Sequence, residues 1–188
     1  MAVSNSTVRT PFLRRLIGAA ALDVGTYEEV EADQSATVQA MLVVLMSSLA
    51  AGIGAHGYGD NTVANVIFMS ILSLLLWAGW ALVTFEVGVR LLPGSETRAD
   101  VGQLLRTIGF ASTPGLLRVM GLMEAITLPV LLVSWTWMLL AMIVAVRQAL
   151  DYRSTGRAVA VCVLGWALAV GIVVVTGLLF GPVVSFAR

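Results

Sequence analysis

The stretch LLRTIGFASTPGLLRVMGLMEA, residues 104–125, decides the topology of this chain. It is mostly apolar, yet it carries the charged residues Arg106, Arg118 and Glu124 and a proline, Pro114. Such a segment can cross a membrane, lie on its surface or pack inside a soluble core. The number of membrane crossings, and therefore the side on which each loop lies, depends on which of these it does.

The composition of the whole chain indicates a membrane protein. Of its 188 residues, 59% are hydrophobic and 12% are charged, whereas soluble proteins average about 25% charged residues. A helix of roughly 20 apolar residues crosses the hydrocarbon core of a bilayer. Four runs of about this length contain no charge, at residues 38–55, 63–85, 126–146 and 158–180. These lengths argue against a soluble bundle of buried helices.

The charged and reactive residues exclude several functional classes. Eleven arginines balance eleven acids, and the chain has no lysine, so nothing favours a nucleic-acid partner. The one histidine, His56, shares a loop with Asp60, and the one cysteine, Cys162, lies in the last apolar run. His56 and Asp60 could bind a metal or a proton weakly, but a solvated loop is the favoured interpretation, and Cys162 is expected to be inert packing. The sequence contains no P-loop and no nucleophile elbow, so we expect no catalytic residues, cofactor or metal.

The first 35 residues are expected to form a cytoplasmic segment with a basic part and an acidic part. In PFLRRLIGAAAL, residues 11–22, the apolar side chains share a helical face, with Arg14 and Arg15 beside it. This pattern suits an amphipathic helix on the anionic inner leaflet, or a helix that packs against the bundle. The acids of TYEEVEAD, residues 26–33, are interpreted as a solvated, capped helix start rather than a cation site. No signal peptide is evident.

The distribution of arginines favours a crossing by residues 104–125. If they cross and the N-terminus is cytoplasmic, two arginines lie outside and nine inside, the latter being Arg9, Arg14, Arg15, Arg90, Arg98, Arg106, Arg147, Arg153 and Arg157. If they do not cross, the loop at 147–157 moves outside with its three arginines. Cytoplasmic loops of membrane proteins carry an excess of positive charge, which is known as the positive-inside rule. This rule favours five crossings.

The charges of this stretch make the crossing unfavourable for an isolated helix. Arg106 and Glu124 are 18 residues apart, about 27 Å along a helix, so both can lie near the interfaces. Arg118 must then lie deeper, and an intramembrane arginine costs about 2.5–3.5 kcal/mol on insertion scales. Neighbouring helices are therefore needed to hold this segment in the membrane.

The proline of the stretch predicts a kink. Pro114 cannot donate a backbone hydrogen bond, so it frees the carbonyl of Phe110. Ser112, Thr113 or a neighbouring helix can donate to that carbonyl instead. We favour a kinked span within residues 104–125 over a re-entrant element buried in protein.

These arguments predict an all-α, polytopic membrane protein with a short N-terminal amphipathic helix. The cytoplasmic segment covers residues 1–35 and the membrane domain residues 36–188. The five spans are expected at about residues 37–56, 63–89, 101–124, 126–149 and 157–181. Small residues four apart, such as Ser48 and Gly52, predict close helix packing inside the monomer.

Charges at membrane depth are the remaining candidates for a functional site. The candidate charge and kink positions are Glu86, Arg106, Pro114, Arg118 and Glu124. We expect Glu86 to pair with Arg90 or Arg106, and Arg118 to pair with Glu124, because buried charges need partners. Such charges can line an ion or substrate path, or they can link helices. Without a second mid-membrane carboxylate or a repeated half, the structural interpretation is favoured.

Two stretches resemble a known family. GSETRADVGQLLRTIGFASTPGLLRVMG, residues 94–121, combines a turn, a capped helix and an aromatic-small-small-x-Pro sequence. It resembles the central region of the Yip family, named for interaction with Ypt/Rab GTPases. FLRRLIGAAALDVGTYEEVEADQSATVQA, residues 12–40, resembles the region that leads into the first span of prokaryotic members. The resemblance covers roughly residues 10–183 and implies a five-pass helical protein with a cytoplasmic N-terminus and a short C-terminal tail outside.

The resemblance implies no catalytic residues. Eukaryotic relatives act in vesicle trafficking and bind small GTPases, but this chain lacks their long N-terminal region and their Asp-Leu-Tyr-Gly-Pro signature. We therefore do not expect GTPase binding. The expected function is that of a non-enzymatic protein of the cell membrane that organises the bilayer or recruits protein partners, whose identity is open, at its cytoplasmic face.

Two other functions stay open at this point. The main alternative is a small transporter or channel that uses Glu86, Arg106, Arg118 and Glu124. A membrane enzyme is the weakest interpretation, because the chain offers almost no nucleophile or acid–base residues.

Overall fold

The computed structural model describes residues 10–54, 63–94, 97 and 99–180. Within these ranges every element is a helix. The loop that holds His56 and Asp60 and both chain ends lie outside the described residues, so the expectations for them are not addressed.

The helices follow the expected apolar runs, with additional breaks. In chain order they are α1 (Phe12–Ala20), α2 (Val24–Ala32), α3 (Ala36–Gly54), α4 (Val63–Phe85), the π-helical η1 (Glu86–Leu91), α5 (Val101–Phe110), the 3₁₀ helices η2 (Thr113–Leu122) and η3 (Glu124–Ile126), α6 (Thr127–Ala149) and α7 (Thr155–Phe180). The segment at residues 101–124, predicted as a kinked span, divides into α5, η2 and the start of η3.

Three helices in the described part are long and apolar enough to cross a membrane. They are Ala36–Gly54, Leu74–Leu91 and Thr127–Ala149, and the shorter apolar helix Thr155–Leu168 belongs to α7. Because about 20 apolar residues match the thickness of a hydrocarbon core, the fold is that of an all-helical, membrane-type protein.

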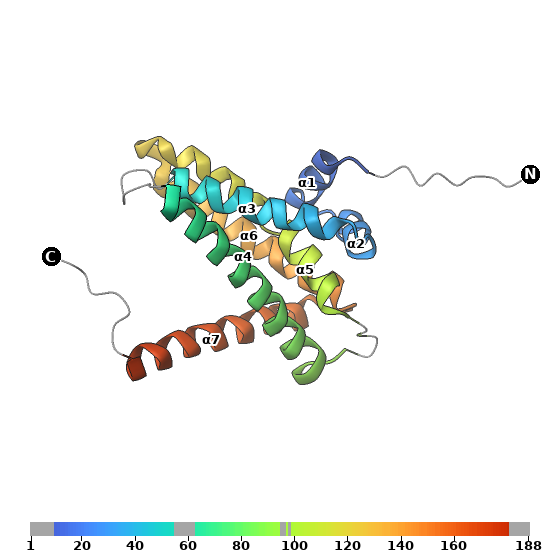
Figure 1. Cartoon of the computed structure of the whole chain (residues 1–188). Coiled ribbons are helices and arrows are strands. Elements are labelled where there is room, and N and C mark those ends of the chain that lie inside the picture. Colours follow the sequence, from blue (N-terminus) through green and yellow to red (C-terminus); the bar gives the residue numbers. More distant parts are fainter. Residues whose placement is uncertain (1–9, 55–62, 95–96, 98, 181–188) are drawn as a thin grey trace, which may run out of the picture.

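Successive helices run in alternating directions through the bundle (Figure 1). α1 and α2 lie at one end of the bundle, beside the starts of α3 and α5. α3 leads away from it, α4 returns, α5 and η2 lead away again, α6 returns, and α7 leads away once more. The start of α1 and the end of α7 therefore lie at opposite ends of the bundle.

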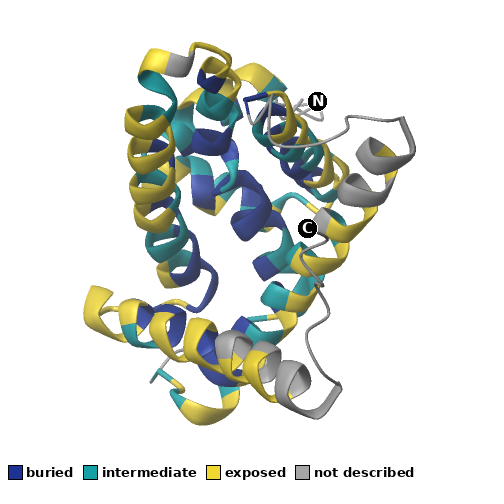
Figure 2. Cartoon of the chain, turned by 90° about the vertical axis from the view of Figure 1, so that its left-hand side faces the viewer, coloured by how far each residue is buried: buried dark blue, intermediate teal, exposed yellow. Residues whose placement is uncertain are grey.

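The buried core includes the N-terminal segment. Figure 2 shows buried residues on the inward faces of the helices and exposed residues on their outer faces. Tyr27 and Val30 of α2 are fully buried beside Val43 of α3 and Phe110 of α5. A second buried cluster, which includes Leu104, joins α5 and the last turns of α4 and α6 to the first turns of α7. α2 is thus part of the core through its apolar side chains, while its acids Glu28, Glu29 and Glu31 are exposed or partly exposed.

A tight turn folds α1 back onto α2. Leu22 has a φ of 60°, and its N–H donates to Ala19 O at 3.1 Å while the N–H of Asp23 donates to Gly18 O at 3.0 Å. This pair of bonds is the Schellman arrangement that closes helix C-termini. A Cβ on Gly18 would lie 2.1 Å from Thr26 Oγ1, so only glycine allows this close approach. The turn directs Arg15 of α1 toward α2.

Candidate functional site

Pro114 breaks the segment where the sequence predicts a kink. α5 ends at Phe110, and Thr113 Oγ1 donates to the freed Phe110 carbonyl at 2.6 Å. Ser134 of α6 donates from Oγ to Pro114 O at 3.0 Å. The Thr113 hydroxyl therefore replaces the backbone hydrogen bond that proline removes, and the Ser134 hydroxyl satisfies the carbonyl of Pro114 itself.

The 3₁₀ form of η2 places its two glycines, Gly115 and Gly121, on one face. Such runs rarely exceed four residues, whereas η2 has ten. A 3₁₀ helix has three residues per turn, so residues six apart share one face. Gly115 and Gly121 of η2 are spaced by six residues and are buried, as is Gly109 in the last turn of the α-helix α5. α5 and η2 therefore present one glycine face.

This glycine face packs against α3 along most of its length. A Cβ on Gly109 would lie 2.6 Å from Ala40 Cβ, and one on Gly115 would lie 2.0 Å from Ser47 Oγ. Further along, a Cβ on Gly121 would lie 2.9 Å from the carbonyl oxygen of Gly54. α5 and η2 therefore run beside α3 in the same direction as far as its last residue.

The small residues of α3 that carry this contact are not those expected from the sequence. A Cβ added to Gly52 would meet nothing within 4 Å, and Ser48 is only partly buried. The prediction that Gly52 packs inside the monomer is therefore wrong. The contact uses Ala40, Ser47 and Gly54 of α3. These residues are seven apart and return to the same face of an α-helix after every two turns.

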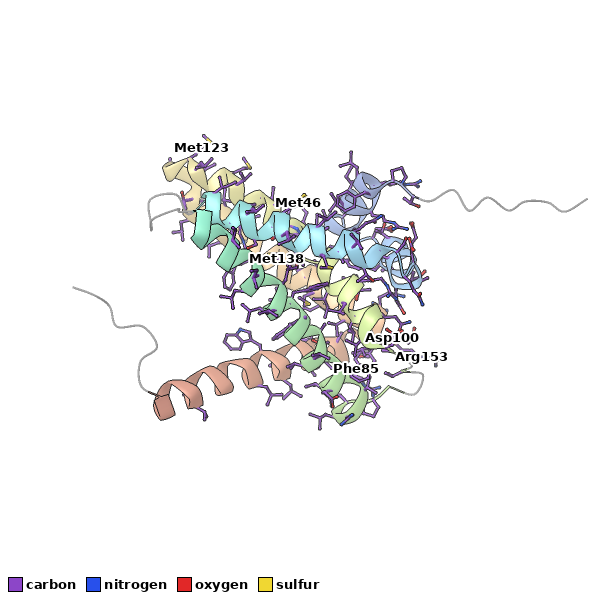
Figure 3. All side chains as sticks on the ribbon, viewed as in Figure 1. Met46, Phe85, Asp100, Met123, Met138 and Arg153 are labelled. Atoms are coloured by element: carbon purple, nitrogen blue, oxygen red, sulfur yellow. The ribbon has the colours of Figure 1, made fainter. Side chains whose placement is uncertain are left out.

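The side chain of Arg118 in η2 lies against the middle of α6. Its Nη2 donates to Met138 Sδ at 2.8 Å, and its guanidinium carbon lies 5.8 Å from the centre of the Trp135 ring. Met138 is the middle residue of α6, Thr127–Ala149. Figure 3 accordingly places Met138 between Met123 at one end of the bundle and Asp100 at the other.

No carboxylate accompanies this arginine among the described side chains. Arg15 and Arg90 form ion pairs elsewhere in the bundle, whereas Arg118 Nε is buried without a hydrogen-bond partner among the described atoms. The side chain of Glu124, its expected partner, lies outside the described part, so that pair stays a prediction. The described neighbours of this cation are a thioether and an aromatic ring, which compensate its charge only weakly.

Arg106 and Glu86 have separate surroundings. Arg106 is buried, and its Nε donates to the carbonyls of Val30 at 3.2 Å and Glu31 at 3.1 Å, in the last turn of α2. It thus caps the negative end of that helix dipole. Glu86 pairs with Arg90 at 2.9 Å, with both side chains largely exposed. The expected pair of Glu86 with Arg90 is confirmed, and the alternative partner Arg106 is wrong.

Arg15 is the residue that the sequence did not single out. Only 3% of its side chain is exposed, and it donates to Glu29 Oε1 at 2.8 Å, Asp33 Oδ2 at 2.7 Å and Gln39 Oε1 at 2.9 Å. These partners belong to α2, the α2–α3 turn and α3. The spacing of four between the two acids hinted at a shared face, but nothing local distinguishes Arg15 from its neighbour Arg14, which is exposed.

We refer to α1 and α2 together with these contacts as the N-terminal cap. Its outer part carries further polar links, from Gln103 Nε2 to Glu31 Oε1 and from Gln148 Nε2 to Glu28 Oε1, both at 3.0 Å. Burial, followed by the nearby charge of Asp151, raises the pKa of Glu31 to about 7. Hydrogen bonds from Ser35 and Arg15 lower the pKa of Asp33 to about 2.

The two shifts predict a docking of the N-terminal cap that depends on pH. The stabilisation linked to protonated Glu31 is complete below its ordinary pKa of 4.5 and is lost as the pH rises through about 7. The stabilisation from ionised Asp33 is present above its ordinary value of 3.8 and is lost as the pH falls through about 2. We therefore expect amide protection factors in α2 to decline between about pH 4.5 and 7 in hydrogen-exchange measurements.

The variant Glu31→Gln is the control for this prediction. Glutamine keeps a hydrogen-bond acceptor for Gln103 but cannot ionise, so the decline should disappear. Above pH 7 the cap of Glu31→Gln should be docked more stably than that of the wild type by about 1 kcal/mol or less, because solvent screens a half-exposed group. An unchanged decline in this variant would assign the pH dependence to other groups.

Comparison with known proteins adds no further constraint. None of the protein families, curated proteins and solved structures compared with the chain matches it. The resemblance to the Yip family therefore stays a proposal, and the site is interpreted from its geometry.

Proposed function

We propose that this chain is a non-enzymatic, Yip-type integral membrane protein that crosses the cell membrane five times and recruits partners or organises the leaflet at its cytoplasmic end. The observation that carries this proposal is the N-terminal cap. Arg15 and Arg106 hold it against the bundle, so the exposed side of the cap is a preformed surface of the membrane domain rather than a loose tail.

The five-pass topology is supported by the course of the broken segment. α5 and η2 accompany α3, a candidate span, from Ala40 to Gly54. With rises of 1.5 and 2.0 Å per residue in the α and 3₁₀ forms, residues 104–122 extend about 34 Å, enough for a hydrocarbon core of about 30 Å. This length and direction favour a span over a re-entrant element.

The outer face of α1 suits contact with the inner leaflet. Leu13 and Ile17 are 66% and 62% exposed, although Phe12 and Leu16 on the same helix pack on the core. An apolar groove of about 570 Å³ continues from the end of α1 along α6, and Trp137 at its edge donates from Nε1 to Ala20 O at 2.7 Å. The two interpretations of α1, packing and membrane contact, are therefore compatible on opposite faces.

Cysteine labelling tests the topology. In a Cys162→Ala background, single cysteines at Val184, Tyr58 and Ser154 are treated from outside intact cells with an impermeant thiol reagent. Five crossings place the first two positions outside and the third inside, so we expect labelling at 184 and 58 and protection at 154. Labelling at 154 together with protection at 184 would instead establish four crossings.

Proximity labelling tests the function. A labelling enzyme fused to the full chain identifies neighbours in native membranes for the wild type, for Arg15→Met, which should undock the cap, and for the exposed control Arg14→Leu. We expect the cytoplasmic neighbours to be lost in the Arg15 variant and kept in the control. An identical set of neighbours in all three would contradict recruitment by the cap.

One observation favours the alternative of a transporter, namely the buried Nε of Arg118, which has no hydrogen-bond partner among the described atoms. However, Glu86 pairs with Arg90, Arg106 caps α2 and Arg118 contacts Met138, so these candidates do not assemble along one path. Solute flux into vesicles that is abolished by Arg118→Leu would establish the transporter and reject our proposal.

A further inference from the structure

A buried tyrosine anchors the connection between α6 and α7. Tyr152 is only 4% exposed, and its hydroxyl shares its proton between the carbonyls of Gly88 at 2.9 Å and Leu92 at 2.7 Å. Asp151 has a φ of 52°, and the N–H of Tyr152 donates to Arg147 O at 2.9 Å, which closes α6 in a Schellman arrangement. The connection is therefore held in one conformation against η1 and the residue that follows it.

Two exposed arginines lie on this anchor. Arg147 donates from Nε to Tyr152 O at 3.3 Å. Arg157 donates from Nη1 to Pro93 O at 3.3 Å, and its guanidinium carbon lies 5.7 Å from the centre of the Tyr152 ring. These described partners are neutral, so they do not cancel either charge. Each guanidinium has five N–H donors, and these contacts use one of them, so most remain for another acceptor.

Both arginines lie at the level of lipid headgroups. Arg147 directly follows the uncharged run at residues 126–146, and Arg157 directly precedes the uncharged run at residues 158–180. Runs of this length match a hydrocarbon core, so a charge that ends one lies at the core boundary. Because both side chains contact Tyr152, they lie at the same boundary. Figure 3 shows Arg153, from the same connection, at the edge of the bundle.

A phospholipid phosphate matches these arginines in charge, geometry and position. Guanidinium groups bind phosphate oxygens in pairs, and the anionic lipids of the inner leaflet attract arginines next to membrane spans. A soluble partner would have to enter the headgroup layer to reach the same donors. The acid of the connection, Asp151, acts instead on Glu31 of the N-terminal cap, and the nearby Glu86 is paired with Arg90.

We propose that Arg147 and Arg157, positioned by Tyr152, bind the phosphate of an anionic phospholipid in the inner leaflet. The inference rests on the proposed function and deepens its leaflet-organising part, because it names the class of lipid and the residues that bind it. It does not depend on the N-terminal cap or on the course of residues 104–125.

Lipid titration of the purified full chain tests this site. The chain, in micelles of a neutral detergent, is titrated with phosphatidylglycerol or phosphatidylcholine, and bound lipids are counted by native mass spectrometry. An arginine near anionic headgroups contributes about fivefold in affinity, so two should give the first phosphatidylglycerol a preference of about 25-fold over phosphatidylcholine. Equal affinities for the two lipids would overturn the proposal.

Charge-matched variants separate the site from the net charge of the chain. Arg147→Gln and Arg157→Gln should each reduce the preference about fivefold, and the double variant should abolish it. Arg90→Gln also removes one positive charge, but Arg90 is paired with Glu86, so its preference should stay close to that of the wild type. An equal loss in all three single variants would assign the preference to net charge and overturn the proposal, as would a preference that persists in the double variant.

A competition arm separates the lipid from soluble anions. Excess inorganic phosphate or a soluble oligoglutamate peptide should leave phosphatidylglycerol bound, because neither has acyl chains. Displacement by phosphate would assign the arginines to a free anion, displacement by the peptide would assign them to an acidic protein segment, and either would overturn the proposal. The assay does not use the cap, so Arg15→Met should bind lipid like the wild type, and the cysteine at Ser154 tests the membrane side separately. Failure of lipid binding is therefore distinguishable from failure of recruitment or of the topology.

Discussion

Gly54→Ala is expected to destabilise the protein by about 3 kcal/mol, at the upper end of overpacking effects. The added Cβ would lie 1.9 Å from the carbonyl oxygen of Arg118. That atom belongs to the backbone of η2, so no side-chain rotation relieves the contact. α3 and η2 must separate at this point, and the glycine contacts along their interface weaken with them.

The chain contains a matched control for this variant two residues away. Gly52 lies on the same helix, and a Cβ there meets nothing within 4 Å. Gly52→Ala should be neutral or stabilising by about 0.5–1 kcal/mol, because alanine favours a helix over glycine. Both variants have the same change in composition and hydropathy, so a difference between them reports the packing alone.

Thermal stability in detergent micelles measures the difference. Heated samples are assayed for the fraction that elutes as folded monomer from size-exclusion chromatography. A loss of about 3 kcal/mol should lower the apparent Tm by roughly 5–10 °C for a chain of this size, with the Gly52 variant at or above the wild type. Equal melting of the two variants would show that η2 does not pack against the end of α3.

Arg15→Met is the second substitution with a large expected effect. It leaves Glu29, Asp33 and Gln39 without their shared donor, and breaking a fully buried pair costs about 3–5 kcal/mol. Here the acids retain 37% and 25% exposure, so water compensates part of the loss. We expect the docking of the N-terminal cap to weaken by about 2–3 kcal/mol.

Hydrogen exchange of α2 amides in lipid nanodiscs reports this docking. Since each 1.4 kcal/mol corresponds to a factor of ten, exchange should accelerate by roughly 30- to 100-fold, with little change at the centre of α3. The exposed neighbour supplies the control, because Arg14→Leu removes the same charge without removing a buried donor. Addition of Glu29→Gln to the Arg15 variant should restore part of the protection. Similar exchange in the Arg15 and Arg14 single variants would reject the ion-pair account.

Several features of the fold follow from local sequence and could be predicted. Long runs without charge identify the candidate spans, because the thickness of a hydrocarbon core sets a length that any spanning helix must meet. The break at Pro114 follows from the missing N–H of proline, and Thr113 was among the expected donors to the freed carbonyl. These properties belong to a residue and its immediate neighbours.

The arrangement of the charges could be predicted only in part. Glu86 pairs with Arg90 four residues away on the same helical surface, which the spacing indicates directly. Arg106 instead donates to carbonyls 75 and 76 residues earlier in the chain. Backbone acceptors leave no trace in residue types, so no pattern in the sequence pointed to α2 as the partner.

The sequence by itself determined the class of the protein, the length and order of its apolar helices and the position of its main break, because these depend on composition and spacing. Only the tertiary structure decided that residues 113–122 form a 3₁₀ helix, that Gly54 rather than Gly52 meets it, and that Arg15 rather than Arg14 is buried. Gly52 and Gly54, like Arg14 and Arg15, are identical residue types one or two positions apart, so the local sequence does not distinguish them. The physical reason is that burial and packing depend on the surface placed opposite a residue, and that surface comes from a distant part of the chain.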